Sequence, residues 1–298
     1  MRFDIPVVGF LIILLVLTGC TGTSSKSTYS VDNNGVLSLA CAPDTTTEEV
    51  LITNNTYSKS RIVFHTENGD VVSYLGVPQN PKAAIVYAPG AGEKLAGHEE
   101  RLIRFARAGY AFLFVDTRGN GGETAGIPFS QQLIQQDYMK FEKGEMPQYY
   151  LSICDLVSAQ KMMCDKYKVP VYSMGSSNGG RYAAVATGID QQFTGYVGIS
   201  TSDWGLLDSL KQQGVTGDPL RFATSLEPGT YIGKISPRPV WIFHARADPI
   251  IPFESGQQFF EKAGEPKKFI EFSGDHGINP DVDNQIIMQW AQIYGTRG

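Results

Sequence analysis

VPVYSMGSSNGGRYAAVA, residues 169–186, is the stretch of this 298-residue chain that decides its fold. It begins as a short apolar run typical of a buried strand and ends with residues typical of a helix. Between the two, residues 175–179 fit Gly-x-Ser-x-Gly with Ser177 at the centre. This spacing indicates a sharp strand-to-helix turn, in which the glycines leave room for neighbouring segments and the serine sits in strained backbone. Ser176 is a second candidate for the exposed hydroxyl, but its own frame lacks the glycine.

Strand and helix patterns alternate on both sides of this turn. Two β-patterned segments, 61–66 and 71–78, flank the tight-turn signal Asn68-Gly69, so we expect a hairpin there. The other apolar runs expected to be strands are 83–90, 110–119, 194–200, 239–245 and 267–274. The helical patterns cover 98–108 and about 149–166, 254–263 and 282–293. This order predicts an α/β fold with a mostly parallel central sheet, an N-terminal antiparallel hairpin and helices on both faces.

Residues that carry chemistry in such a fold gather at the carboxyl ends of the strands, where Ser177 is expected. A serine hydroxyl is a poor nucleophile at neutral pH and needs a base that a carboxylate orients. Among four histidines, His276 lies in a strand-end loop near the C-terminus, in FSGDHGIN. His244 is inside an apolar run, and His65 and His98 precede the serine. We therefore expect His276 to be the base, with an ordinary surface-loop histidine as the alternative.

The orienting acid has one first candidate and one alternative. Asp248 comes in the loop directly after the apolar run 239–245 and is the expected acid. Asp203, after the run 194–200, is a second candidate, because catalytic triads are defined by geometry and not by sequence position. Asp275 is adjacent to His276 in the sequence, and the side chains of adjacent residues point in different directions. Asp275 is therefore poorly placed to orient His276.

A serine attacking an acyl group also needs two backbone donors for the negative oxygen that develops. The amide of Asn178, directly after Ser177, is expected to be one of them. The second is expected from the loop Pro89-Gly90-Ala91-Gly92, and Ala91 is the choice there. The glycines of that loop would also make a tight turn, which does not conflict with the role of Ala91.

With these pieces in order, the chain from about Arg61 onward resembles the α/β-hydrolase superfamily, especially its dienelactone-hydrolase and prolyl-oligopeptidase-like branch. The matching segments are NGDVVSYLGVP, YAPGAG, GYAFLFVDTRGNGG, GSSNGG, PRPVWIFHARADPIIP and SGDHG. The resemblance implies a serine hydrolase with nucleophile Ser177, acid Asp248, base His276, no cofactor and no metal. The chain departs from many relatives at Pro89, where they carry the histidine of a His-Gly-x-Gly loop.

The chemistry expected from these residues is acyl transfer to water through an acyl-enzyme. The first expectation for the substrate is a small carboxylic ester, and a short peptide is the second. A noncatalytic binding lipoprotein on a hydrolase scaffold is the rival from another class, because fold does not fix function. The insert 203–235 is expected to form a small cap, in which Trp204, Phe222 and Tyr231 either line the substrate pocket or only fill the core.

The N-terminal residues resemble a targeting signal and are not expected to be part of the folded domain. The apolar run at residues 5–17 is too short to cross a bilayer easily and suits a signal peptide. It ends in Leu17-Thr18-Gly19-Cys20, which resembles a lipobox, so we expect a leader at 1–19, lipidation of Cys20, a flexible tether over 20–46 and the hydrolase domain at 47–298. An uncleaved anchor helix is the alternative. In either case the globular part would lie outside the cytoplasmic membrane. With lipidation the lipid on Cys20 would attach it, and fractionation of a Cys20→Ser variant would check this.

Composition narrows the partners further. The net charge is −5 and no block of Lys and Arg stands out, so nucleic acid is not an expected partner. Cys154 and Cys164 share one helical segment at roughly 15 Å separation, too far apart for a disulfide, and are expected to be buried thiols. Cys41 could pair with one of them only if the fold brings it there.

Overall fold

The computed structural model describes residues 26–42 and 45–295 of the chain. The expected leader, the lipobox and Cys20 lie outside the described residues. No helix among the described residues is both long enough and apolar enough to cross a membrane.

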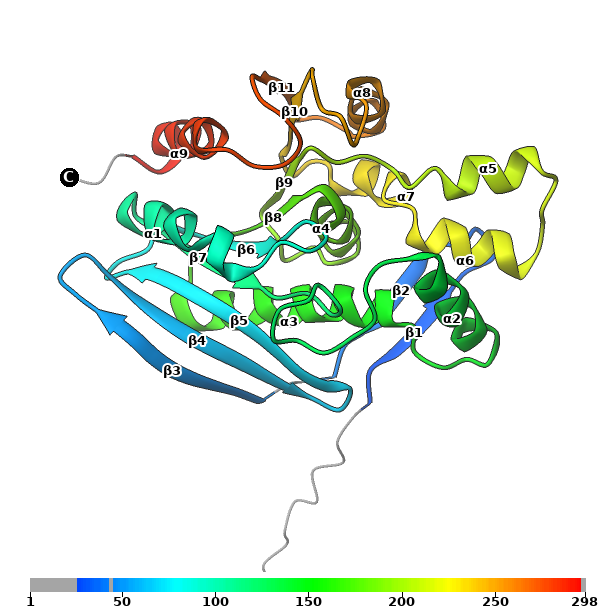
Figure 1. Cartoon of the computed structure of the whole chain (residues 1–298), viewed down its shortest axis with the longest axis horizontal. Coiled ribbons are helices and arrows are strands. Elements are labelled where there is room, and N and C mark those ends of the chain that lie inside the picture. The colour runs from blue at the N-terminus through cyan, green and yellow to red at the C-terminus, as the bar shows by residue number, and fades with distance from the viewer. Residues whose placement is uncertain (1–25, 43–44, 296–298) are drawn as a thin grey trace, which may run out of the picture.

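A nine-stranded sheet in the order β11-β10-β9-β8-β6-β7-β5-β4-β3 forms the centre of the molecule (Figure 1). Its strands are β3 (Thr45–Thr53), β4 (Tyr57–Thr66), β5 (Gly69–Pro78), β6 (Ala83–Ala88), β7 (Tyr110–Val115), β8 (Val171–Ser176), β9 (Gly195–Ile199), β10 (Val240–Ala245) and β11 (Lys267–Phe272). The six strands β6 to β11 run parallel, and β3, β4 and β5 are antiparallel to their neighbours. The expected parallel sheet with an N-terminal hairpin is confirmed.

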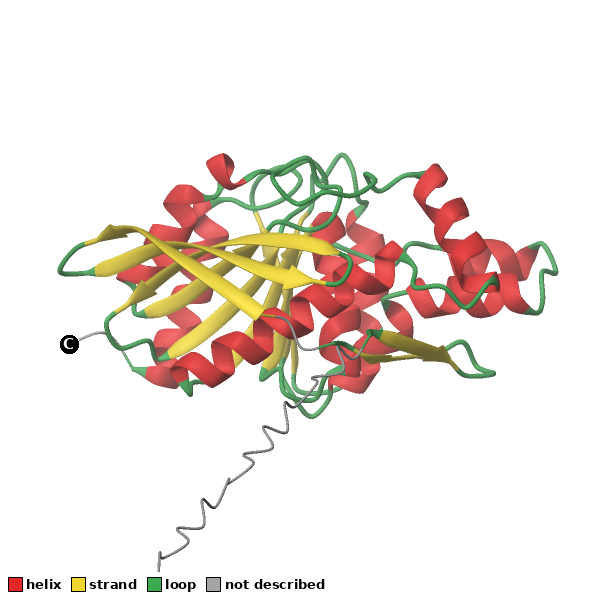
Figure 2. Cartoon of the chain, turned by 90° about the horizontal axis from the view of Figure 1, so that it is seen from below, coloured by secondary structure: helices red, strands yellow, loops and turns green. Residues whose placement is uncertain are grey.

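Helices cover both faces of this sheet (Figure 2). They are α1 (Glu99–Arg107), α2 (Gln131–Glu142), α3 (Gln148–Tyr167), α4 (Ser177–Ile189), α5 (Leu206–Gln212), α6 (Asp218–Leu226), α7 (Gly229–Ile232), α8 (Phe253–Glu261) and α9 (Pro280–Tyr294), with short 3₁₀ turns at Leu95–Gly97 and Gly233–Ile235. Successive side chains of a strand point to opposite faces of the sheet, so β6 contributes to the hydrophobic core on each face. Ala84 and Val86 pack with α3 and α4, whereas Ile85 and Tyr87 pack with α1 and α9.

The segment 203–235, which was expected to form a cap and is called the cap below, contains α5, α6 and α7. Of these, α5 and α6 extend from one end of the molecule beside α2 (Figure 1). Trp204 lies at the start of this segment, before α5, and Glu227 lies directly after α6 and contacts that start. The carboxylate of Glu227 accepts hydrogen bonds from the backbone amides of Trp204, Gly205 and Leu207, so it ties the start of the cap to the end of α6.

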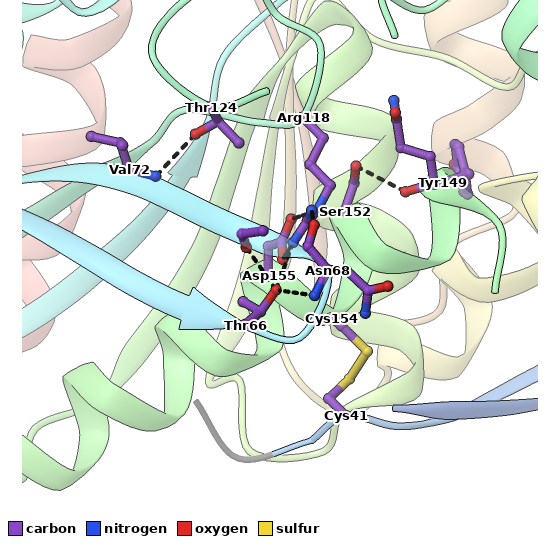
Figure 3. Close-up of polar contacts among 12 residues, drawn as sticks. Cys41, Thr66, Asn68, Val72, Arg118, Thr124, Tyr149, Ser152, Cys154 and Asp155 are labelled. Atoms are coloured by element: carbon purple, nitrogen blue, oxygen red, sulfur yellow. Dashed lines mark hydrogen bonds and ion pairs between the residues drawn. A yellow bond between two sulfur atoms is a disulfide. The ribbon is translucent and has the colours of Figure 1, made fainter. Parts of the chain in front are cut away.

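Residues 26–42, which we call the N-terminal strap, are the main departure from expectation. The predicted tether to residue 46 is wrong here, because β1 (Thr28–Val31) and β2 (Leu37–Ala40) pair as an antiparallel hairpin. A disulfide between Cys41 and Cys154 fixes the strap to α3 (Figure 3). The expectation of a Cys154 thiol is therefore wrong as well, whereas Cys164 is free and half-buried. The helical spacing of Cys154 and Cys164 excludes a disulfide between these two residues. It gives no information on the path of the strap, which brings Cys41 beside α3.

Candidate active site

Ser177 lies at the sharp turn between β8 and α4, with its φ at +50°. A side chain on Gly179 is excluded, because a Cβ there would lie 2.1 Å from the carbonyl oxygen of Ala88. A Cβ on Gly175 would lie 2.4 Å from the carbonyl carbon of Gly179. The two glycines of the motif therefore allow β6, β8 and α4 to approach closely. The left-handed conformation of the serine is the strain that this packing imposes.

Asp248 and His276 are in direct contact at the same edge of the sheet. Nδ1 of His276 lies 2.9 Å from Oδ1 and 2.8 Å from Oδ2 of Asp248. Oδ1 also accepts hydrogen bonds from the amides of Ile250 and Ile251, both at 2.9 Å. Burial alone would raise the pKa of Asp248, but these hydrogen bonds outweigh it and leave the pKa below its usual value. An ionised carboxylate can only accept, so Nδ1 carries the hydrogen and leaves Nε2 as the basic nitrogen.

The loop that carries His276 packs against the turn that carries Ser177. The amide of Gly277 donates to Oγ of Ser200, at the end of β9, over 3.0 Å. A Cβ on Gly277 would lie 3.7 Å from Oγ of Ser176, the residue before Ser177. Strands β8 and β9 are neighbours in the sheet, and their ends therefore bring the histidine loop to the serine turn.

The other candidates for base and acid are held by structural contacts, and one of them, His244, also has its Nε2 3.6 Å from Oδ2 of Asp248. Asp203 accepts a hydrogen bond from the amide of Gly229 and pairs with Lys262. His244 is fully buried, and its Nε2 lies 2.9 Å from the carbonyl oxygen of Ile251. His244 therefore supports the loop of Asp248, as its place in an apolar strand predicts. The remaining histidines pair with carboxylates elsewhere: His65 with Asp70, and His98 with Glu93.

The expected donors Ala91 and Asn178 also lie at this edge. Asn178 is the second residue of α4, and first-turn amides have no partner inside their helix. In the loop after β6, the amides of Gly90 and Gly92 are already bound to side chains, at 2.8 Å to Glu93 and 2.9 Å to Asn120. Sequence reasoning did not single out these two side chains.

The three aromatic residues expected in a substrate pocket divide into two groups. Trp204 lines a cavity of about 530 Å³ between the start of the cap and α8. Both faces of its ring are covered, by Phe129 at 4.1 Å and by the guanidinium of Arg181 at 4.0 Å. Phe222 and Tyr231 are buried in the core with α3 and α4, so the structure favours the alternative that they only fill it.

Within residues 26–42 and 45–295, no three side chains of His, Cys, Asp or Glu come together in a way that could hold a metal ion.

Comparison with known proteins gives consistent likenesses. A family model described as "Serine aminopeptidase, S33" matches residues 79–206. The protein named "Uncharacterized protein YfhR" of Salmonella typhi is 22% identical over 222 residues, covering 71% of this chain and 70% of that protein. Among solved structures, the acetyl xylan esterase from Paenibacillus sp. R4 superposes with a TM-score of 0.67 at 15% identity, covering 85% of this chain and 89% of that one. Acetyl Xylan Esterase 1 from Thermoanaerobacterium sp. JW/SL YS485 gives 0.64 at 12% identity, covering 83% and 88%.

Proposed function

We propose that this chain, which has an α/β-hydrolase fold and matches a serine hydrolase family model over residues 79–206, is a serine hydrolase that cleaves small carboxylic esters. Ser177 is the proposed nucleophile, His276 the base and Asp248 the acid. The observation that carries the proposal is the pair of contacts, 2.8 and 2.9 Å, between Nδ1 of His276 and the Asp248 carboxylate. The loop that carries His276 packs against the turn of Ser177.

In the proposed reaction, Nε2 of His276 takes the hydroxyl proton of Ser177 while Oγ attacks the acyl carbon. The negative oxygen of the tetrahedral intermediate would accept hydrogen bonds from the amides of Ala91 and Asn178. Its collapse breaks the ester bond, and the departing alcohol takes the proton from His276. Water then attacks the acyl-enzyme with His276 again as base, which releases the acid and restores Ser177.

An ester is preferred to a peptide because similarly folded solved proteins are esterases by name. The second candidate, a peptidase acting on short peptides, is favoured by one observation, the match to a model described as serine aminopeptidase. Both reactions would use the same acyl-enzyme, so the two candidates differ only in the group that leaves.

A fluorophosphonate probe tests the nucleophile directly. We expect covalent labelling of the wild-type protein, no labelling of Ser177→Ala and unchanged labelling of Ser176→Ala, the matched control one residue away. A panel of p-nitrophenyl esters and aminoacyl nitroanilides then separates esterase from peptidase. An unlabelled, folded wild-type protein would favour a noncatalytic binding role and end the proposal.

A further inference from the structure

One side chain holds much of the loop at residues 89–93. Oε2 of Glu93 accepts a hydrogen bond from the amide of Gly90 at 2.8 Å and from the hydroxyl of Tyr87 at 3.3 Å. It also lies 3.1 Å from Nε2 of the buried His98. Burial alone would raise the pKa of Glu93, but the hydrogen bonds from His98 and Gly90 outweigh it and leave the pKa below its usual value. The group is therefore a carboxylate at neutral pH, and it folds the loop back on itself.

A second side chain holds the same loop from the other side. Asn120, in the loop after β7, is 8% exposed. Its Oδ1 accepts from the amide of Gly92 at 2.9 Å, and its Nδ2 donates to the carbonyl oxygen of Glu93 at 2.6 Å. Both groups of the carboxamide are therefore used, one as acceptor and one as donor.

The loop of Asn120 is itself anchored on both sides (Figure 3). Two residues earlier, Arg118 makes paired hydrogen bonds of 2.7 and 3.0 Å with the buried carboxylate of Asp155 on α3. Four residues later, Oγ1 of Thr124 accepts from the amide of Val72 on β5 at 2.9 Å. Asn120 is therefore fixed to the scaffold and does not simply follow the movement of the loop it contacts.

These contacts leave one amide free in Gly90-Ala91-Gly92. Gly90 and Gly92 donate to Glu93 and Asn120, and Ala91 has no acceptor within the described part of the chain. We propose that Glu93 and Asn120 are positioning residues that hold the 89–93 loop so that the amide of Ala91 points at the developing oxyanion. The inference rests on the proposed function. It gives a physical replacement for the histidine that many relatives carry where this chain has Pro89.

The test compares Glu93→Ala, Glu93→Gln and Asn120→Ala with Glu100→Ala, an exposed acid at the start of α1. The readouts are kcat and KM for p-nitrophenyl acetate and the inhibition constant of a trifluoromethyl ketone, whose hemiketal carries the oxyanion. We expect both loop alanine variants to lose about 10²-fold in kcat with KM little changed, because a misplaced donor stabilises the transition state poorly. Affinity for the ketone should fall in the same proportion as kcat/KM.

Glu93→Gln keeps an oxygen for the amide of Gly90 and should recover most of the lost kcat, and Glu100→Ala should match wild type. Folding is checked by circular dichroism, and the glutamine variant keeps the test informative if Glu93→Ala is unstable. Folded alanine variants with wild-type kcat, or with equal losses in substrate and ketone binding, would overturn the inference alone. A wild-type protein that no fluorophosphonate labels would overturn the proposed function together with it.

Discussion

Among the described residues, positive φ outside glycine occurs at Lys168, Ser177 and Ser200. The first caps a helix, but the two serines lie at the ends of β8 and β9, where the candidate site is built. Each such conformation costs of the order of 1–3 kcal/mol and persists only where its surroundings fix it. Contacts around both serines do this. Oγ1 of Thr201 donates to the carbonyl of Ser177 at 2.9 Å, and Oγ of Ser200 accepts from Gly277 at 3.0 Å.

Asp248→Asn tests which acid orients the base. The amide would keep the shape of the side chain, but its nitrogen cannot accept the hydrogen of Nδ1, so the imidazole would be held less well and its positive form would lose its counter-charge. We expect kcat for p-nitrophenyl acetate to fall by the order of 10⁴-fold. Asp203→Asn is the matched comparison and should keep most of its activity, because Asp203 pairs with Lys262 and not with His276. A larger loss in the Asp203 variant would reverse the assignment.

At this scale the sequence was enough to anticipate that Asp248 and His276 meet, because each follows a strand of one parallel sheet. Glu93 and Asn120 could not be found in the same way. Their importance depends on two loops lying side by side, and neither loop has a periodic pattern that predicts its path. Pairs of polar residues after neighbouring strands β6 and β7 were the available signal.

The strands and helices of the central sheet with a clear period were predicted well, whereas β3 and the strap, which were not predicted, lack one. Strand β3 is exposed along its whole length, so it shows no alternation of apolar and polar residues that would mark a half-buried strand. The strap has the Ser- and Thr-rich surroundings of a tether, yet Leu37 on β2 is buried in the main core. Its backbone also bonds to the cap: Arg221 donates to the carbonyls of Val31 and Asp32.

The disulfide joins Cys41 and Cys154, which are 113 residues apart in the sequence. Closing so long a loop lowers the conformational entropy of the unfolded chain and thereby stabilises the folded protein. We expect the double variant Cys41→Ser/Cys154→Ser to lose about 2–4 kcal/mol in the free energy of unfolding, measured by urea denaturation. The free Cys164 provides the control, and Cys164→Ser should change stability much less. Equal midpoints for the two variants would mean that the strap is held by its packing alone.

Across the whole molecule, the cap and the serine turn are mechanically connected. Arg181, one turn after Ser177 on α4, donates to the carbonyls of Ser202 (3.0 Å) and Asp203 (3.1 Å), and its guanidinium covers the ring of Trp204. The start of the cap is therefore fixed near the N-terminal end of α4, the helix that carries the candidate nucleophile. The end of α6 is held by the hydrogen bonds of the buried Glu227. Because Glu227 is a carboxyl group, this connection depends on pH.

Glu227 gives the cap a predicted pH dependence. Burial, and then the nearby charge of Asp203, raise the pKa of Glu227 above its usual 4.5, and the amides of Trp204, Gly205 and Leu207 compensate only in part. A carboxyl group with a raised folded-state pKa holds its proton more tightly when folded. Its contribution to stability is therefore complete below pH 4.5 and is lost as the pH rises through the folded pKa.

Glu227→Gln removes this titration but keeps one oxygen for the amides of Trp204 and Gly205. The variant should be less stable at low pH, because its nitrogen cannot accept from Leu207. As the pH rises from 4 to 8, the melting temperature of wild type should fall relative to the variant, since only wild type has a buried carboxyl group to ionise there. Groups that do not interact with Glu227 titrate equally in both proteins and cancel in the difference. A constant difference in melting temperature across this range would show that Glu227 is ionised at no cost, and that the cap is held independently of pH.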